Sequence, residues 1–141
     1  MIRQAKLEDM EQVLEVLSHL APVDRDIHSD TFAKIMDLDS CDTLVWVSSF
    51  GHEVGDIIAV GSLWILQKVI RGYGKMGQIE DVVVLPEYRG SGFGKMIIAA
   101  LIERAKDRGC YKIILSCTEY NEPFYNKCGF TKHESTMRID L

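Results

Sequence analysis

Apolar side chains recur along the chain with two different periods. Between residues 7 and 20 they are spaced three and four apart, as on a helix with one buried face. Around residues 57–69 and 78–85 the chain is rich in β-branched residues, which is typical of strands. The pattern predicts strands at 2–6, 43–48, 57–69, 78–85, 111–117 and 130–139, with the one at 111–117 buried. It predicts helices at 7–20 and 29–38, from the turn at 89–94 to about 108, and a short helix or turn at 121–127.

Glycine and proline residues separate these elements. Breaks are expected at Pro22, in the turn 51–56, at 72–74 and at Pro86. Because strands and helices are interspersed, the fold class is α/β, with a mixed central β-sheet flanked by helices and a core around the strand at 78–85. The chain contains no linker, repeat or low-complexity tract, so residues 1–141 are expected to form one domain.

Composition restricts the functional classes. A chain of 141 residues with 47% hydrophobic content is typical of one globular domain. Its net charge of −5 argues against a nucleic-acid partner, although residues 71–141 hold 11 Lys/Arg against 9 Asp/Glu and could serve an anionic small molecule. No apolar run approaches the roughly 18 residues of a membrane helix. The first nine residues lack an apolar signal core, so we expect a cytoplasmic protein with no membrane partner.

The cysteines and histidines show no metal-site pattern. Cys41, Cys110, Cys117 and Cys128 form no C-x-x-C pair, and the four histidines add no ligand spacing to them. We therefore expect reduced, buried, structural thiols and no metal.

The segment Arg89-Gly90-Ser91-Gly92-Phe93-Gly94 carries the strongest chemical signal. It joins a strand to a helix, and backbone N–H groups at a helix start are unpaired and attract anions. Glycines let such a backbone approach a phosphate closely. The spacing fits neither a P-loop nor a dinucleotide-binding turn, because Lys95 is followed by Met96 and no third glycine falls in register.

This segment resembles the R/Q-x-x-G-x-G/A signature of the GNAT superfamily of N-acetyltransferases, whose order of elements also matches. The resemblance implies the GNAT fold over nearly the whole chain, with acetyl-CoA as co-substrate. Its pyrophosphate would lie on the glycine turn, its pantetheine arm along the preceding strand, and residues near 121–127 would flank it. The implied acetyl-CoA-binding residues are Val82, Val83, Val84, Arg89, Gly90, Ser91, Gly92, Phe93, Gly94, Lys95, Asn121, Tyr125, Asn126 and Lys127.

Two further stretches resemble one branch of that superfamily, the glucosamine-6-phosphate N-acetyltransferases. They are Q-I-E-D-V-V-V at 78–84 and G-C-Y-K-I-I-L-S-C at 109–117, the latter continuing to F-Y-N-K-C-G-F at 124–130. The branch typically has His where this chain has Gln78, and Asp where it has Ser116. It often ends in a basic residue after the last strand, for which Arg138 is the candidate.

The resemblance assigns roles to several polar residues. The Tyr125 hydroxyl would protonate the leaving CoA thiolate. Glu80 and Asp81 would bind the sugar and orient or deprotonate its amine, and burying two adjacent acids would be costly without such a role. Further substrate contacts are implied for Lys68, Arg71, Tyr111, Lys112, Ser116 and Arg138.

The implied reaction is acetyl transfer from acetyl-CoA to glucosamine 6-phosphate, a step toward UDP-N-acetylglucosamine. The resemblance also implies a homodimer whose C-terminal strands contribute to the partner's site. Two alternatives stay open. The acceptor could be another amine, on a small molecule or a protein, or the chain could be an acyl-CoA-binding domain without catalysis.

Overall fold

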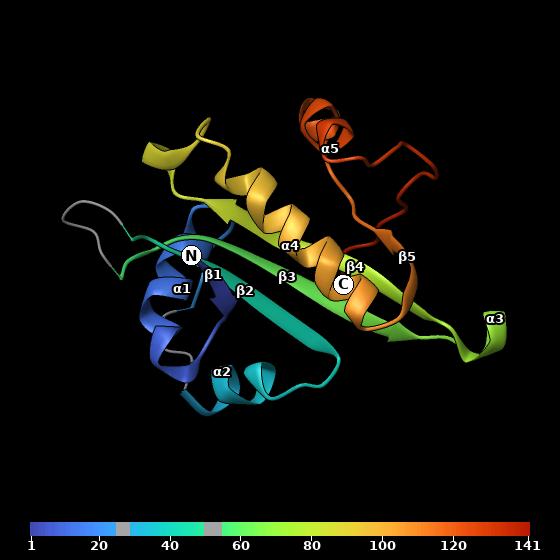
Figure 1. The fold of residues 1–141 in the computed structure, drawn as a ribbon, viewed down its shortest axis with the longest axis horizontal. Helices are drawn as coiled ribbons and strands as arrows, with labels where there is room; N and C mark the ends of the chain where they lie inside the picture. Colours follow the sequence, from blue (N-terminus) through green and yellow to red (C-terminus); the bar gives the residue numbers. More distant parts are fainter. Residues whose placement is uncertain (25–28, 50–54) are drawn as a thin grey trace.

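The computed structural model describes residues 1–24, 29–49 and 55–141, and over these residues it forms one five-stranded sheet (Figure 1). The strands are β1 (Ile2–Gln4), β2 (Cys41–Val47), β3 (Ile57–Gln67), β4 (Lys75–Val84) and β5 (Cys110–Ile114). They lie in this same order across the sheet. The pairs β1–β2, β2–β3 and β3–β4 are antiparallel, and β5 runs parallel to β4. The predicted mixed sheet is therefore confirmed.

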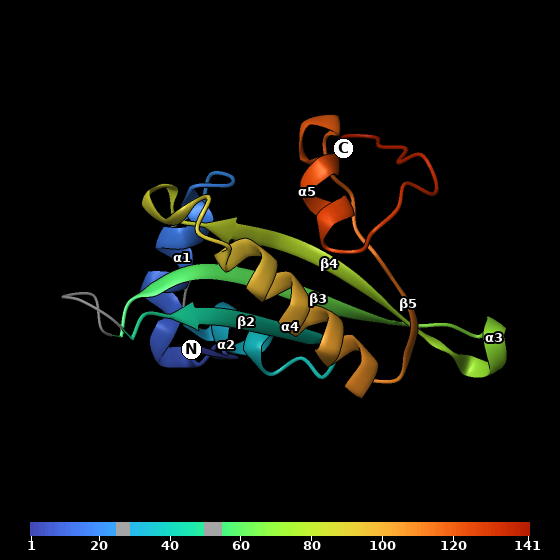
Figure 2. The ribbon, with the colours of Figure 1, turned by 45° about the horizontal axis from the view of Figure 1, so that its top comes forward.

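Helices cover both faces of the sheet. The helices α1 (Met10–Ser18) and α2 (Ser29–Met36) lie against one face, and α4 (Phe93–Asp107) crosses the other (Figure 2). The short α5 (Glu122–Lys127) follows β5. A helical turn, α3 (Ile70–Tyr73), lies at the far end of the β3–β4 hairpin and projects beyond the sheet in both views.

The two faces bury two separate cores. Strand β3 supplies both, because its successive side chains point to opposite faces. Leu63 packs with Ile97 and Leu101 under α4, and all three are fully buried. On the other face Val60 packs with Val13 and Val16 of α1. The central strands are thus buried from both sides, which fixes their register.

Most predicted elements are confirmed, with ends shifted by a few residues. The first predicted helix begins instead with a 3₁₀ turn at Leu7–Asp9. The break expected at 72–74 is confirmed, because α3 and the left-handed residues Arg71, Gly72 and Tyr73 separate β3 from β4. Five of the six predicted strands are present. Most of the turn expected at 51–56 lies outside the described residues.

Two predictions about the C-terminal part are wrong. The strand expected at 111–117 is short and largely exposed, because β5 is the last strand of the sheet. The segment 130–139 forms no strand. It returns past β5 held by side-chain contacts, Ser116 Oγ to Thr136 Oγ1 at 3.1 Å and Lys132 Nζ to Glu122 Oε1 at 2.8 Å, and not by a backbone ladder.

In the described part of the chain, no helix has the length and apolar character needed to cross a bilayer.

Candidate active site

The site begins where β4 and β5 separate. Their parallel ladder runs from Lys75 opposite Cys110 to Gln78 opposite Ile114, where β5 ends. Strand β4 continues to Val84 without a partner on that side. Backbone N–H and C=O groups on this edge of β4 can therefore bind an extended ligand.

A β-bulge lies in this part of β4, which pairs with β3 but has no neighbour on the β5 side. Ser62 pairs with Glu80 and Val60 pairs with Val83, so the single residue Gly61 faces both Asp81 and Val82. Asp81 adopts a left-handed backbone conformation, with φ of 54°. Glu80 is half-buried and Asp81 is exposed, so the strand does not bury the two acids together.

The two acids have distinct surroundings. The Gln78 side-chain nitrogen donates a hydrogen bond to Glu80 Oε1 at 2.5 Å. The pKa of Asp81 is raised, first by its partial removal from water and then by the negative charge of Glu80. A carboxylate with a raised pKa is a better proton acceptor than an ordinary one.

The glycine turn has the conformation that its sequence requires. Gly90 and Gly92 have φ of 82° and 88°, in the region that disfavours side chains, and Gly92 directly precedes α4. The Arg89 side chain bonds back to the Val84 carbonyl at 3.1 Å, which ties the turn to the end of β4. The first turn of α4 presents N–H groups that have no partner within the helix. The turn can therefore hold an anion beside the open edge of β4.

Tyr125 comes from α5, on the other side of this opening. Its ring is half-buried and meets Phe124 and Phe130 edge-on, with centroids 5.0 and 6.2 Å away. Burial raises the pKa of the phenol, and negative charge at Cys117, Cys128 and Glu80 adds to the shift. The hydroxyl therefore stays protonated at neutral pH, within electrostatic reach of Glu80.

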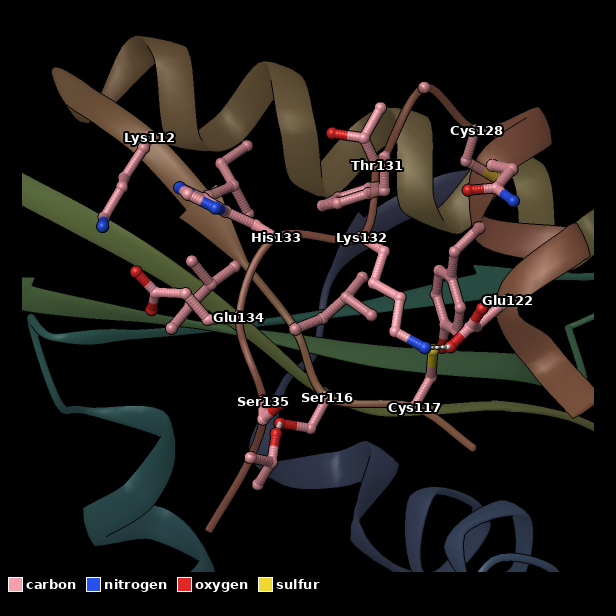
Figure 3. Close-up of a pocket in the computed structure, with 18 of the residues that line it drawn as sticks. Lys112, Ser116, Cys117, Glu122, Cys128, Thr131, Lys132, His133, Glu134 and Ser135 are labelled. Atoms are coloured by element: carbon pink, nitrogen blue, oxygen red, sulfur yellow. Dashed lines mark hydrogen bonds and ion pairs between the residues drawn. The ribbon is translucent and has the colours of Figure 1, made fainter. Parts of the chain in front are cut away.

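A cavity of about 890 Å³ is lined by residues of β5, of α5 and of the segment that follows α5 (Figure 3). Four residues predicted for the site line it: Lys112, Ser116, Tyr125 and Asn126. The segment 128–136 forms another of its walls. The glycine turn, Glu80 and Asp81 do not line it, so the cavity adjoins the opening between β4 and β5 and does not replace it.

Lys112 also belongs to a second group of predicted substrate residues, where the β3–β4 hairpin turns. The Lys68 backbone N–H bonds to Gly74 O at 2.9 Å, and a side chain at Gly74 would meet both the Tyr111 ring and Arg71. Lys112 Nζ lies 5.8 Å from the centre of the Tyr111 ring. We call Lys68, Arg71, Tyr111 and Lys112 the cationic corner. Arg138 lies outside both groups and pairs with Asp140 at 2.6 Å.

Several residues close to Glu80 and Tyr125 were not predicted to belong to the site. Gln78 bonds Glu80, and the thiols of Cys117 and Cys128 are near enough to Tyr125 to affect its pKa. Cys117 is exposed, contrary to the expectation that the cysteines are buried. The spacing of two residues between Gln78 and Glu80 could have placed both on one face of a strand, whereas contacts across the fold give no signal in the sequence.

Comparison with known proteins gives a consistent result. The sequence pattern described as "Acetyltransferase (GNAT) family" matches residues 10–130. The chain is 40% identical over 141 residues to glucosamine 6-phosphate N-acetyltransferase of Trypanosoma brucei brucei, covering 99% of this chain and 95% of that protein. It is 35% identical over 142 residues to glucosamine 6-phosphate N-acetyltransferase 1 of Oryza sativa subsp. japonica, covering 98% and 85%. The crystal structure of glucosamine-6-phosphate N-acetyltransferase from Arabidopsis thaliana aligns with a TM-score of 0.89 at 33% identity, covering 100% of this chain and 97% of that one.

Proposed function

The chain belongs to the acetyltransferase (GNAT) family, and we propose that it transfers the acetyl group of acetyl-CoA to the amine of glucosamine 6-phosphate. The products are N-acetylglucosamine 6-phosphate and CoA. The observation that carries the proposal is the opening between β4 and β5, which has Glu80 on one strand, Tyr125 within its electrostatic reach, and beside it a glycine turn suited to an anion. These are the proton donor, the acceptor-binding acid and the cofactor-binding surface that the reaction needs.

Acetyl-CoA would bind along β4 and the glycine turn. The pantetheine arm takes the place of a neighbouring strand beside Val82, Val83 and Val84, on the edge of β4 that β5 leaves open. The pyrophosphate accepts hydrogen bonds from the turn at 89–95, which leads into α4. Asn121, Asn126 and Lys127, in and just before α5, would flank the CoA. This placement brings the thioester toward the Tyr125 hydroxyl.

The transfer then needs two proton movements. The neutral amine attacks the thioester carbonyl carbon, a C–N bond forms, the C–S bond breaks, and CoA leaves as a thiolate. Tyr125 donates its proton to the sulfur. Asp81 or Glu80 accepts the proton that the amine loses, directly or through water, and the raised pKa of Asp81 suits that role.

The acceptor would use both groups of polar residues described above. Glu80, Asp81 and the Ser116 backbone carbonyl would bind the amine and the sugar hydroxyls. Lys and Arg side chains of the cationic corner, with Arg138, would neutralise the phosphate.

We further propose that the protein is a homodimer in the cytoplasm, acting on the route to UDP-N-acetylglucosamine. Met137, Ile139 and Leu141 are almost fully exposed after β5, an arrangement that would leave apolar side chains in water in a single copy. Val69 and Ile70 are also exposed beside the cationic corner. A second copy would cover these residues and could receive the C-terminal segment. Light scattering on the intact chain should give twice the mass of one chain, and a monomer at micromolar concentration would contradict this.

The test of the substrate is a comparison of kcat/KM for glucosamine 6-phosphate, glucosamine and a panel of other amines. Two charge-assisted contacts to the phosphate should favour the phosphorylated sugar by about two to four orders of magnitude. Arg71→Ala and Lys112→Ala should each reduce that preference and leave acetyl-CoA binding unchanged. Equal rates on the two sugars would favour another acceptor, and acetyl-CoA binding without turnover would favour a non-catalytic domain.

A further inference from the structure

We propose that Gln78 is a positioning residue for the acetyl acceptor, acting through the Glu80 carboxylate. The inference rests on the proposed function only in taking Glu80 as a group that binds the amine-bearing substrate. It starts from the 2.5 Å hydrogen bond that the Gln78 side-chain nitrogen donates to Glu80 Oε1.

The two residues differ in how firmly the sheet holds them. Gln78 pairs with Trp64 on β3 and with Ile114 on β5, so neighbouring strands fix its backbone on both sides. It is the last residue of β4 that pairs with β5. Glu80 lies two residues further, at the edge of the bulge, where β4 has lost one neighbour. The hydrogen bond therefore ties a carboxylate in the open part of the strand to a side chain in its rigid part.

The remaining neighbours of Glu80 do not duplicate this contact. Across the ladder lies Ser62, whose buried hydroxyl is 3.3 Å from that of Thr43. Among the side chains of the described residues, Gln78 is the one that forms a hydrogen bond to the Glu80 carboxylate. The bond occupies Oε1 and leaves Oε2 to accept a proton or a hydrogen bond from the substrate. The amide must turn its nitrogen toward the carboxylate, because its own carbonyl oxygen would repel it.

The chemistry of the amide suits this task. A glutamine side chain carries no charge at any working pH, so it holds the carboxylate without titrating with it. A hydrogen bond to a charged group also limits rotation of that group, which matters where a shift of about 1 Å can cost two orders of magnitude in rate. Gln78 thus sets the direction of the second Glu80 oxygen toward the acceptor.

The test is a double-mutant cycle built on Gln78→Met, which keeps the length of the side chain but removes its N–H donor. We expect kcat/KM for the amine acceptor to fall between about tenfold and a hundredfold, the worth of a hydrogen bond to a charged group. KM for acetyl-CoA and the melting temperature should stay close to those of the wild type. Gln78→His, which again offers an N–H, should recover most of the loss. In a Glu80→Ala background, Gln78→Met should have no further effect.

Gln4→Met provides the matched control, since Gln4 lies in β1 and its side-chain oxygen has no hydrogen-bond partner among the described residues. An unchanged kcat/KM in Gln78→Met would overturn the proposal, as would an equal loss with and without Glu80. If the wild type prefers an amine other than glucosamine 6-phosphate, the proposed function fails and the same cycle on that amine still decides the role of Gln78. If the wild type acetylates no amine, both proposals fail.

Discussion

The chain divides at residue 105 into two regions of opposite character. Every buried residue in the described structure lies between Ala5 and Ala105, in what we call the packed region. From residue 106 to the C-terminus, the open region, no residue is buried. In Figure 2 the sheet, α1 and α4 form one body, and α5 with the C-terminal segment stands beside it.

The difference separates most of the stability from one part of the chemistry, since Glu80, Asp81 and the glycine turn belong to the packed region. The packed region buries apolar side chains on both faces of the sheet, which is the main source of folding free energy. The open region adds exposed polar contacts, such as Lys132 with Glu122, and exposed ion pairs stabilise little. Yet it holds Tyr125 and most of the wall of the large cavity. Substitution of buried residues in the packed region should therefore affect mainly stability, and substitution of site residues should affect mainly kinetics. The predictions below test that separation.

The largest effect is expected at Tyr125, in the open region. Tyr125→Phe removes the hydroxyl that protonates the thiolate and keeps the ring that packs on Phe124 and Phe130. The value of kcat should fall by about 10²–10⁴-fold, with both substrates bound nearly as before and the melting temperature hardly changed. Steady-state kinetics and thermal melts measure both. Tyr120→Phe, at a position 91% exposed, is the control and should be silent. A kcat within twofold of the wild type, with chemistry rate-limiting, would remove Tyr125 from the mechanism.

The second prediction concerns the packed region, where a substitution should change stability and leave kcat nearly unchanged. Leu101, a residue of α4, is fully buried against the sheet. Leu101→Ala should lower the free energy of unfolding by about 2–5 kcal/mol, through lost burial and the cavity left behind. The kcat of the remaining folded enzyme should stay within a few-fold of the wild type. Urea denaturation gives the first quantity and initial rates the second. Glu103→Ala, on the exposed side of the same helix, should change neither. A large kcat loss in Leu101→Ala at full folding would show that the two regions are not separable.

The third prediction concerns Asp9, whose hydrogen bonds stabilise the N-terminal end of the packed region. The buried Asp9 carboxylate accepts bonds from Arg3 at 2.6 and 2.8 Å and from the Lys6 N–H at 2.7 Å. The bond from Arg3 is the main reason that the pKa of Asp9 is lowered. Its stabilisation is present above the ordinary pKa of 3.8 and is lost as pH falls through the lower folded value. Asp9→Asn should cost about 1.5–3 kcal/mol at pH 7.

The pH dependence of that cost provides its check. The stability difference between Asp9→Asn and the wild type should shrink as denaturation is repeated below about pH 3.8. The neighbouring Glu8→Gln, at an exposed carboxylate, is the control and should show little difference at any pH. A difference between Asp9→Asn and the wild type that does not vary with pH would show that Asp9 acts through shape and not through charge.

The smallest effect is expected at Asp81, in the active site. Removing its charge should raise stability slightly, whereas removing the charge of Asp9 lowers it. The pKa of Asp81 is raised, so its contribution to stability is complete below 3.8 and is lost as pH rises through the folded value. Asp81→Asn should therefore raise the melting temperature slightly at pH 7 and have no effect below pH 3.8, while kcat/KM falls. Melting curves at several pH values measure the first effect. A lower melting temperature at pH 7 would mean that the charge at Asp81 stabilises the fold.

The packed region could be predicted closely from the sequence, and the reason is periodicity. Buried helices and strands repeat at 3.6 and 2 residues, so α4 and β3 are visible in the order of apolar residues. The glycine turn was also predictable, since its positive φ angles at Gly90 and Gly92 need glycine. The resemblance to acetyltransferases, confirmed by the matching relatives, rested on the glycine turn and on 78–84 in this region, and on 109–117 and 124–130 in the open region.

The open region was predicted less well, because its structure depends on contacts between distant residues. The segment 130–139 has residues that a strand would accept, but a strand also needs a free edge in register, and none pairs with it. The bulge at Asp81 lies opposite Gly61 of the neighbouring strand, where a Cβ would lie 2.7 Å from the Ile97 side chain on α4, a contact that the local sequence does not reveal. The grouping of Lys68 and Arg71 with Lys112, apart from Glu80, likewise follows from the path of the hairpin.

The bulge at Asp81 also bears on how this sequence can change over generations. It absorbs one extra residue in β4, so that Ile79 and Val82 share the α4 face although they are three residues apart. Deleting residue 81 would restore plain alternation and leave Val82, Val83 and Val84 on the faces that they occupy now. Replacing residue 81 by another amino acid also preserves these faces. The core therefore does not depend on which residue stands at this position, and lineages can alter the acid chemistry here without rebuilding the packing of the strand.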